Sequence, residues 1–191
     1  MYWPDKNVFT IDIPKTACVT RWNIAKELYK ERLLSGHMTM SFAADRLAKK
    51  LDIDYRDVEF RTVIRNPERR LLSSANYHYK QIYKMQDRKP NLDNYLAEVR
   101  DSKYWNGTVY RAQGSWLDLE DIEVKLWPLE RYDDFLFQLG WDQPVPRANK
   151  STEFWSLDDL RHSAHYDLFM SKYEHDWHLY QKALDNFAGS P

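Results

Sequence analysis

The sequence predicts an α/β fold, in which a central parallel sheet is flanked by helices. Three short runs have the continuous or alternating apolar character of strands: Val8–Ile13, Asp57–Ile64 and Ile122–Trp127. Longer runs with apolar residues at helical spacing separate them, and strands that alternate with helices pair in parallel. No repeat, low-complexity stretch or linker divides the chain, so residues 1–191 are predicted to form a single domain.

Composition excludes several classes of protein. Hydrophobic residues make up 43% of the chain and aromatic residues 15%, which is too apolar for a disordered protein. The 28 basic residues balance 29 acidic ones, so no overall field favours nucleic acid or an anionic membrane. A single cysteine excludes an internal disulfide. No apolar run is long enough to span a membrane and no signal peptide is evident, which indicates a cytoplasmic protein.

The first predicted strand, Val8–Ile13, ends at Pro14, which has no N–H group to give to a sheet. Small and β-branched residues follow, and an amphipathic helix is expected beyond them, with apolar residues from Trp22 to Leu33. The backbone N–H groups of such a turn converge with the positive end of the helix dipole. With Lys15 beside them, this loop is predicted to bind an anion, most often a phosphate.

The later elements follow from turn residues and apolar spacing. Helices are expected from an N-cap at Ser41 to Leu51, from Pro67 to about Met85, around Leu92 to Val99, from Pro128 to Leu139, and, as two helices divided near Ser171, from Leu157 to about Phe187. Ligands of parallel α/β sheets lie at the carboxyl ends of the strands.

Two stretches at predicted strand-to-helix junctions resemble the signatures of sulfotransferases. The first is similar to the 5′-phosphosulfate loop of that family, P-K-T/S-G-G/T-T-S/T. Its members here are Pro14, Lys15, Thr16, Ala17, Cys18, Val19 and Thr20. It is not a Walker A loop, because it contains no glycine. The second stretch, Arg65 to Ser73, supplies the family's R-N/D-P-x-x-R-x-x-S in full.

Later segments resemble the family more loosely. They are the glutamine segment at Gln113, the strand that ends near Glu130, the P-x-x-N-K-S-like loop at Val145–Ser151, and the closing Y-x-x-D-x-x-x-Y helix at Tyr173–Tyr180. The resemblance therefore spans nearly the whole chain and is closest to the carbohydrate branch. It implies a P-loop-NTPase-like sulfotransferase fold, 3′-phosphoadenosine-5′-phosphosulfate (PAPS) as sulfuryl donor, and a carbohydrate hydroxyl as acceptor.

The resemblance also implies residue roles. Lys15 is expected to stabilise the leaving 5′-phosphate, since sulfuryl transfer depends on neutralising charge on the leaving oxygens. The backbone of residues 16–20 and the hydroxyls of Thr16 and Thr20 are expected to hold the phosphosulfate. Arg65 and Ser73 match the residues that bind the 3′-phosphate, which a guanidinium contacts through a planar fork.

The loop departs from the family pattern at Ala17, Cys18 and Val19, where glycine and threonine are usual. Val19 lacks the usual hydroxyl, and one hydrogen bond fewer costs about 0.5–1.5 kcal/mol. Weaker cofactor binding with an intact fold is therefore expected. Cys18 is expected to be a small packed residue rather than a reactive thiol at a helix N-terminus.

A general base is needed to accept the proton of the acceptor hydroxyl. Gly36-His37 resembles the G-H segment of heparan and dermatan 2-O-sulfotransferases, in which the histidine is the base, and histidine titrates in the useful range. The competing interpretation of His37 is a packed, chemically idle residue. Other members of the family use a glutamate near the first helix, which makes Glu27 or Glu31 the alternative.

Other charged residues are expected to be structural. Arg69 and Arg70 are interpreted as partners of Glu68 or another carboxylate. The histidines His162, His165, His175 and His178 form i, i+3 pairs, but no acidic partner or cysteine set completes a metal site. Two other functions remain open: a nucleotide-binding protein of the same fold without catalysis, and a small-molecule kinase.

Overall fold

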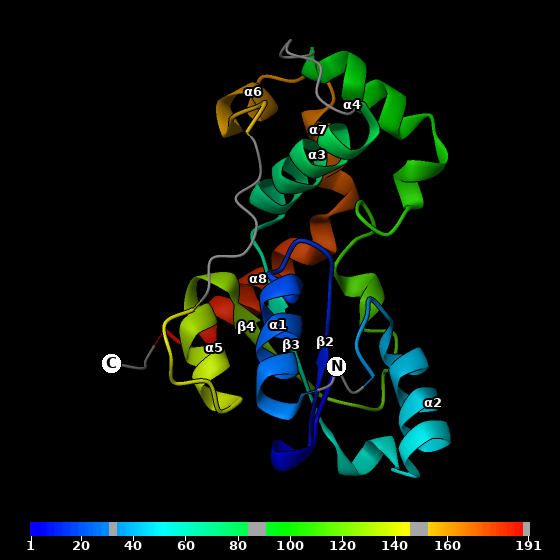
Figure 1. Cartoon of the computed structure of the whole chain (residues 1–191). Coiled ribbons are helices and arrows are strands. Elements are labelled where there is room, and N and C mark those ends of the chain that lie inside the picture. Colours follow the sequence, from blue (N-terminus) through cyan, green and yellow to red (C-terminus); the bar gives the residue numbers. More distant parts are fainter. Residues whose placement is uncertain (31–33, 84–90, 146–152, 189–191) are drawn as a thin grey trace.

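A computed structural model of the chain describes residues 1–30, 34–83, 91–145 and 153–188. In chain order its strands and α-helices are β1 (Tyr2–Trp3), β2 (Val8–Ile11), α1 (Cys18–Tyr29), α2 (Met40–Leu51), β3 (Glu59–Ile64), α3 (Pro67–Tyr83), α4 (Leu92–Arg100), β4 (Val124–Pro128), α5 (Tyr132–Gln138), α6 (Leu157–Arg161), α7 (Tyr166–Lys172) and α8 (Glu174–Asp185). The sheet and the helices around it occupy the lower part of the molecule in Figure 1, and α3, α4, α6 and α7 gather above it.

The sheet confirms the predicted α/β class but is mixed rather than wholly parallel. Its strand order is β1-β2-β3-β4, and β2, β3 and β4 run parallel to one another. At the edge, β1 pairs antiparallel with β2, with Trp3 opposite Val8. The turn between them is a short 3-10 helix, Pro4–Lys6, which Asn7 ends in a left-handed conformation with φ 50°. This turn folds the first residues back along the strand that follows.

Helices cover both faces of the sheet, as expected. Side chains that alternate along each strand point to opposite faces, so each face has its own core. One core packs α2 and α8 against the sheet and includes Phe9, Ile11, Leu47, Phe60 and Ala183. The core on the other face packs α1 and α5 and includes Val8, Ile24, Val63, Phe135 and Leu136.

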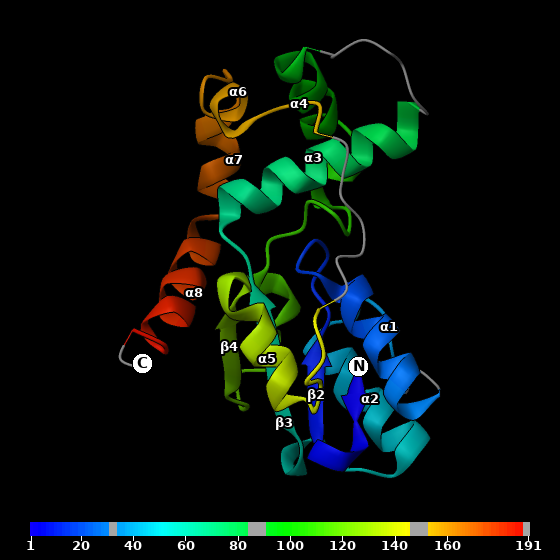
Figure 2. The ribbon, with the colours of Figure 1, turned by 60° about the vertical axis from the view of Figure 1, so that its left-hand side comes forward.

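The helices α3, α4, α6 and α7 form a separate cluster beyond the carboxyl ends of the strands, which we call the helical layer. Figure 2 shows α3 lying across the top of the sheet, with α4, α6 and α7 around it. Its core contains Leu71, Tyr79, Leu96, Trp155 and Phe169. The helical layer therefore closes the space above the edge of the sheet where ligands are expected.

Two predicted helix starts were wrong. The N-cap of α2 is Thr39, whose side chain accepts a hydrogen bond from the Phe42 amide, whereas Ser41 binds the Asp118 carboxylate instead. Pro128 is the last residue of β4, and a 3-10 turn separates it from α5.

The C-terminal region also differs from the prediction, since it holds three helices, α6, α7 and α8, where two were expected. Two breaks divide them. One lies between Arg161 and Tyr166, and the other is at Tyr173, close to the predicted break near Ser171. The predicted extension of α3 to Met85 and the helical position of Leu33 lie outside the described residues.

Candidate functional site

The loop that follows β2 has an uncommon backbone conformation. Lys15 and Ala17 have φ values of 69° and 61°, in the left-handed region that residues other than glycine rarely adopt. Ala17 is the N-cap of α1, and no side chain caps the helix there. Since the first amides of a helix have no intrahelical acceptor, the N–H groups at this end are left to bind something else. Strained backbone of this kind clusters at ligand sites, and anion binding by this loop stays a prediction.

A buried ion pair supports this loop from below. Arg21 donates to Asp12 Oδ1 through Nε at 2.9 Å and to the Thr16 carbonyl through Nη1 at 2.9 Å. Trp22 Nε1 donates to the other oxygen of Asp12 at 2.7 Å. Burial alone would raise the pKa of Asp12, but the positive charges of the amino terminus and Arg21 outweigh it and lower that pKa. Asp12 is therefore a carboxylate that anchors the start of α1.

Thr16 does not have the orientation expected for its hydroxyl. Its Oγ1 donates to the Ile13 carbonyl at 2.8 Å and lies 3.4 Å from Arg21 Nη2, and the residue is fully buried. The hydroxyl therefore belongs to the support of the loop, because Arg21 and Ile13 offer it partners inside the protein. Its predicted contact with the phosphosulfate stays a prediction.

A second junction, between β3 and α3, meets the loop from the neighbouring strand. Arg65 Nη1 donates to the Lys15 carbonyl at 3.1 Å, and Arg70 Nε donates to the Pro14 carbonyl at 3.2 Å. Arg70 also donates to the Arg111 carbonyl at 2.8 Å and is almost fully buried, so its role is structural, as predicted. The expectation that Arg69 or Arg70 pairs with Glu68 or another carboxylate is not met at Arg70, whose partners among the described residues are backbone carbonyls.

Glu68 instead pairs with Arg161 of α6, through two hydrogen bonds of 2.9 and 2.7 Å. This partner lies far along the chain, where sequence alone does not connect it to Glu68. The ion pair joins α3 and α6 within the helical layer. Arg69 is exposed.

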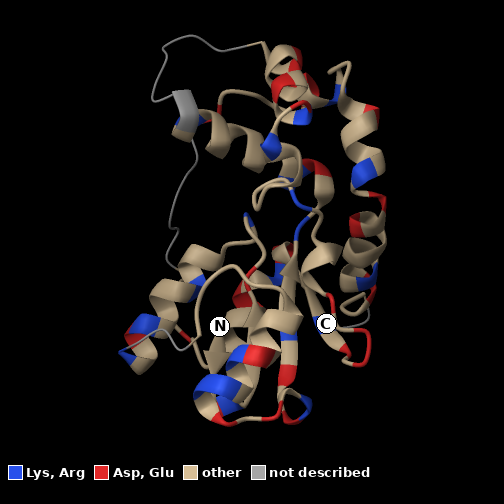
Figure 3. Ribbon diagram, turned by 90° about the vertical axis from the view of Figure 1, so that its right-hand side faces the viewer, with Lys and Arg blue, Asp and Glu red and all other residues tan. Residues whose placement is uncertain are grey.

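Both junctions open into one cavity of about 620 Å³ between the sheet and the helical layer. All the predicted site residues except Thr16 line it: Lys15, Ala17, Cys18, Val19, Thr20, His37, Arg65 and Ser73. The segments that carry these residues are far apart in the sequence, and the parallel sheet brings them together because the carboxyl ends of β2 and β3 meet at one edge. Figure 3 shows Lys and Arg residues along this junction.

Two cations in the cavity, Lys15 and Arg65, form no ion pair among the described residues, although the charge of Glu130 offsets part of the effect of burial on Arg65. Burial, and then the nearby charge of Arg65, lowers the pKa of Lys15 to about 8. Burial, and then the charges of Arg69 and Arg70, lowers the pKa of Arg65 to about 10. The Nε atom of Arg65 is buried and has no hydrogen-bond acceptor among the residues that the structure describes. A bound anion would relieve these penalties, because it would supply the opposite charge and the missing acceptor.

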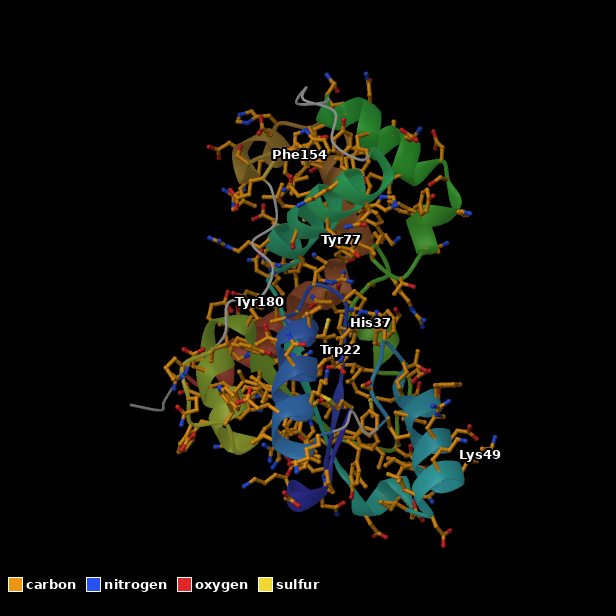
Figure 4. The ribbon with its side chains drawn as sticks, viewed as in Figure 1. Trp22, His37, Lys49, Tyr77, Phe154 and Tyr180 are labelled. Carbon is orange, nitrogen blue, oxygen red and sulfur yellow. The ribbon has the colours of Figure 1, made fainter. Side chains whose placement is uncertain are left out.

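His37 lies at the edge of this cavity with a defined tautomer. Its Nδ1 is 2.6 Å from the Asp12 carbonyl, and since a carbonyl only accepts, Nδ1 carries the proton and Nε2 keeps its lone pair. The ring packs against Trp22 and Trp116, with centroid distances of 5.1 and 6.2 Å. Figure 4 shows His37 beside Trp22 and below Tyr77. In the neutral ring, Nε2 is then the acceptor, and the Cys18 sulfur is the partner recorded nearest to it.

Cys18 lies next to His37, with Sγ 4.0 Å from Nε2. The cysteine is 5% exposed, and burial raises the pKa of its thiol. A raised pKa disfavours the thiolate, which agrees with the packed, unreactive residue expected here. Of the alternative bases, Glu27 is exposed on α1 and does not line the cavity, and Glu31 lies outside the described residues.

Sequence reasoning missed the contribution of α3. Asn76, Tyr77, Lys80 and Gln81 line the cavity on the same helix as Ser73. The Lys15 ammonium lies 4.2 Å from the centre of the Tyr77 ring, a cation–π contact. Helical spacing could have predicted this contribution. Tyr77, Lys80 and Gln81 stand four, seven and eight positions after Ser73 and therefore lie on the same face of the helix.

Among the described residues, no group of three or more His, Cys, Asp or Glu side chains is arranged to hold a metal ion. No helix within the described part of the chain has the length and apolar character needed to cross a membrane. The loop resembling P-x-x-N-K-S extends over residues 146–151, outside the described residues.

Fold and site together define an α/β protein with a cavity at the carboxyl edge of its four-stranded mixed sheet. No protein-family model, curated protein or solved structure matches this chain. The function is therefore argued from the site itself.

Proposed function

We propose that this chain is a PAPS-dependent sulfotransferase that transfers a sulfuryl group to a hydroxyl. In keeping with the family resemblance, we propose that this hydroxyl belongs to a carbohydrate. The observation that carries the proposal is the convergence of Lys15, His37, Arg65 and Ser73 on one cavity from separate segments. The family resemblance implies three tasks for them: Lys15 for the leaving phosphate, His37 for the acceptor proton, and Arg65 with Ser73 for the 3′-phosphate.

The cavity offers two places for anionic groups, which fits a ligand phosphorylated at two separate positions. The uncapped N-terminus of α1 and Lys15 form the first place, suited to a 5′-phosphosulfate. Arg65 and Ser73 form the second, suited to a 3′-phosphate. The buried Nε of Arg65, with no acceptor among the described residues, supports an anion there. A nucleoside triphosphate, whose charges lie along one chain, matches this pair less well.

The chemistry then assigns a task to each side chain. PAPS supplies a sulfuryl group on a phosphate leaving group, and the acceptor oxygen forms its bond to sulfur as the bond to the 5′-phosphate oxygen breaks. His37 Nε2 takes the proton of the acceptor hydroxyl. The Lys15 ammonium stabilises the charge that develops on the leaving phosphate.

Calorimetric titration with 3′-phosphoadenosine-5′-phosphate (PAP), with 5′-AMP and ATP as controls, tests the proposal. We expect PAP to bind more tightly than 5′-AMP by about 1.5–3 kcal/mol, the usual strength of hydrogen bonds to a charged group. Arg65→Ala is expected to remove most of that difference and to leave 5′-AMP binding nearly unchanged.

The other outcomes separate the alternative functions. ATP binding at least as tight as PAP binding, with transfer of its phosphate, would support a kinase. Tight PAP binding without sulfuryl transfer to any hydroxyl acceptor would support a nucleotide-binding protein without catalysis.

A further inference from the structure

The backbone of Arg65 is held by a side chain rather than by the sheet. Arg65 lies one residue beyond the end of β3, where the pairing with β4 stops at Ile64. Its N–H group donates to Gln113 Oε1 at 2.9 Å, and Gln113 Nε2 donates back to the Arg65 carbonyl at 2.9 Å. Gln113 therefore replaces a neighbouring strand at this position, with both hydrogen bonds of a strand pair.

Gln113 is itself held by the C-terminal helix. Its backbone N–H and that of Gly114 donate to the two carboxylate oxygens of Asp176, at 2.8 and 2.9 Å. Gln113 is fully buried and Asp176 is 1% exposed. Bonds between a buried carboxylate and two amides are among the stronger ones in proteins, so this contact strongly restrains Gln113.

The close approach of this turn to α8 depends on a glycine. A Cβ atom at Gly114 would lie 2.4 Å from Cδ2 of His175, so any larger residue would displace that ring. The chain thus has a small residue at the point where the Asp176 carboxylate reaches the two amides. Asp176, Gln113 and Arg65 form one continuous series of buried hydrogen bonds from α8 to the cavity.

The series bears on ligand choice because Arg65 lines the cavity and its guanidinium can bind an anion. Its Nη1 donates to the Lys15 carbonyl, which leaves the remaining guanidinium donors for a ligand. A backbone shift at Arg65 would move this fork away from the phosphate position, and two-point contacts lose strength steeply when misaligned.

We propose that Gln113 and Asp176 are positioning residues that set the preference of the site for a ligand with a second phosphate, by fixing the backbone of Arg65. This inference rests on the proposed function. It predicts that changes at these two residues weaken PAP binding selectively, while the binding of 5′-AMP, which lacks the 3′-phosphate, is retained.

The test is the ratio of PAP affinity to 5′-AMP affinity in Gln113→Met and Asp176→Asn. We expect the ratio to fall roughly tenfold in Gln113→Met, which loses both hydrogen bonds to Arg65. A smaller fall is expected in Asp176→Asn, which keeps one acceptor oxygen and serves as the second variant if Gln113→Met does not fold.

Tyr173→Phe is the matched control. It removes a buried 2.8 Å hydrogen bond to the Tyr110 carbonyl at the start of α8 without touching Arg65. Its stability to urea is expected to fall, but its affinity ratio is expected to match that of the unchanged protein. An unchanged ratio in folded Gln113→Met, or an equal fall in Tyr173→Phe, would overturn the proposal.

A failure of the proposed function gives a different result. If the unchanged protein does not bind PAP more tightly than 5′-AMP, the proposed function fails. The positioning of Arg65 by Gln113 is then measured by NMR, through amide hydrogen exchange and the binding of inorganic sulfate. Gln113→Met is then expected to speed exchange of the Arg65 amide and to weaken sulfate binding. If both stay as in the unchanged protein, the positioning role is wrong as well.

Discussion

Lys15 and Arg65 show how single residues prepare this cavity for an anion. Burial lowers the pKa of Lys15 to about 8 and the pKa of Arg65 to about 10. The two residues are far apart in the sequence, and the parallel pairing of β2 and β3 brings them together. Lys15 rests against the ring of Tyr77, which provides a weak cation–π partner. An anionic ligand would compete successfully for the ammonium, because an opposite charge in a partly desolvated site attracts it more strongly.

At the same scale, His37 is expected to act on the reaction and not on nucleotide binding. His37→Ala removes the Nε2 lone pair, so the rate of sulfuryl transfer from PAPS should fall about 10²–10⁴-fold, the usual contribution of a general base. PAP affinity by calorimetry should stay unchanged. His162→Ala, on the exposed end of α6, is the control. An unchanged rate in His37→Ala would remove His37 from the mechanism.

At the scale of elements, the start of α2 holds the segment that carries His37. The Asp118 carboxylate accepts from the amide and the hydroxyl of Ser41, at 2.8 and 2.6 Å. Burial alone would raise the pKa of Asp118, but the hydrogen bonds from Ser41 and Thr39 lower it below its usual 3.8. Because the folded-state pKa is depressed, the stabilisation is fully present above the unfolded-state pKa of 3.8 and is lost as the pH falls through the folded-state pKa.

Asp118→Ala should therefore lower the free energy of unfolding at neutral pH by about 1 kcal/mol, a value reduced for the exposure of this contact. Urea unfolding measures it. The neighbouring exposed carboxylate Glu120 provides a control variant, Glu120→Ala, expected to change stability by less than about 0.5 kcal/mol. Equal effects from both variants would show that the Asp118 contact does not secure α2.

At the scale of the whole molecule, the helical layer contributes one wall of the cavity and has its own buried polar cluster. His78 Nδ1 lies 2.6 Å from the Tyr95 hydroxyl, which lies 2.8 Å from that of Tyr110. Burial lowers the pKa of His78 below its usual 6.5. The unfolded chain therefore takes up a proton more readily than the folded protein, and stability is lost as the pH falls below about 6.5.

The free energy of unfolding is thus expected to decrease between pH 7 and pH 5, with a smaller decrease in His78→Phe than in the unchanged protein. Urea unfolding curves at both pH values measure this difference. His178→Phe, at an exposed position of α8, is the control. If His78→Phe keeps the whole pH dependence, His78 is not its source.

Part of the fold could be predicted because its signals are local. The strand at Val8 and the helix start at Pro67 each depend on a few adjacent residues, and the structure contains both. The predicted end of that strand at Ile13 was wrong, since β2 ends at Ile11. The strand β1 was missed because two residues are too few to show a period, and it forms only when Asn7 turns the chain back. The additional break at the C-terminus also left no clear mark in apolar spacing.

The candidate site divides in the same way. The sequence by itself predicted the anion-binding loop with Lys15 from the residues that follow one strand. The resemblance to sulfotransferases implied the roles of Arg65, Ser73 and His37. Only the tertiary structure decided which way they face, because orientation depends on partners from distant segments. Asp12 and Arg21 turn the Thr16 hydroxyl inward, Tyr77 receives the Lys15 ammonium, and Asp176 acts through Gln113 on Arg65. The contacts of Tyr77 with Lys15 and of Asp176 and Gln113 with Arg65 follow from no local pattern, since they join residues that meet only when the helices have packed around the sheet.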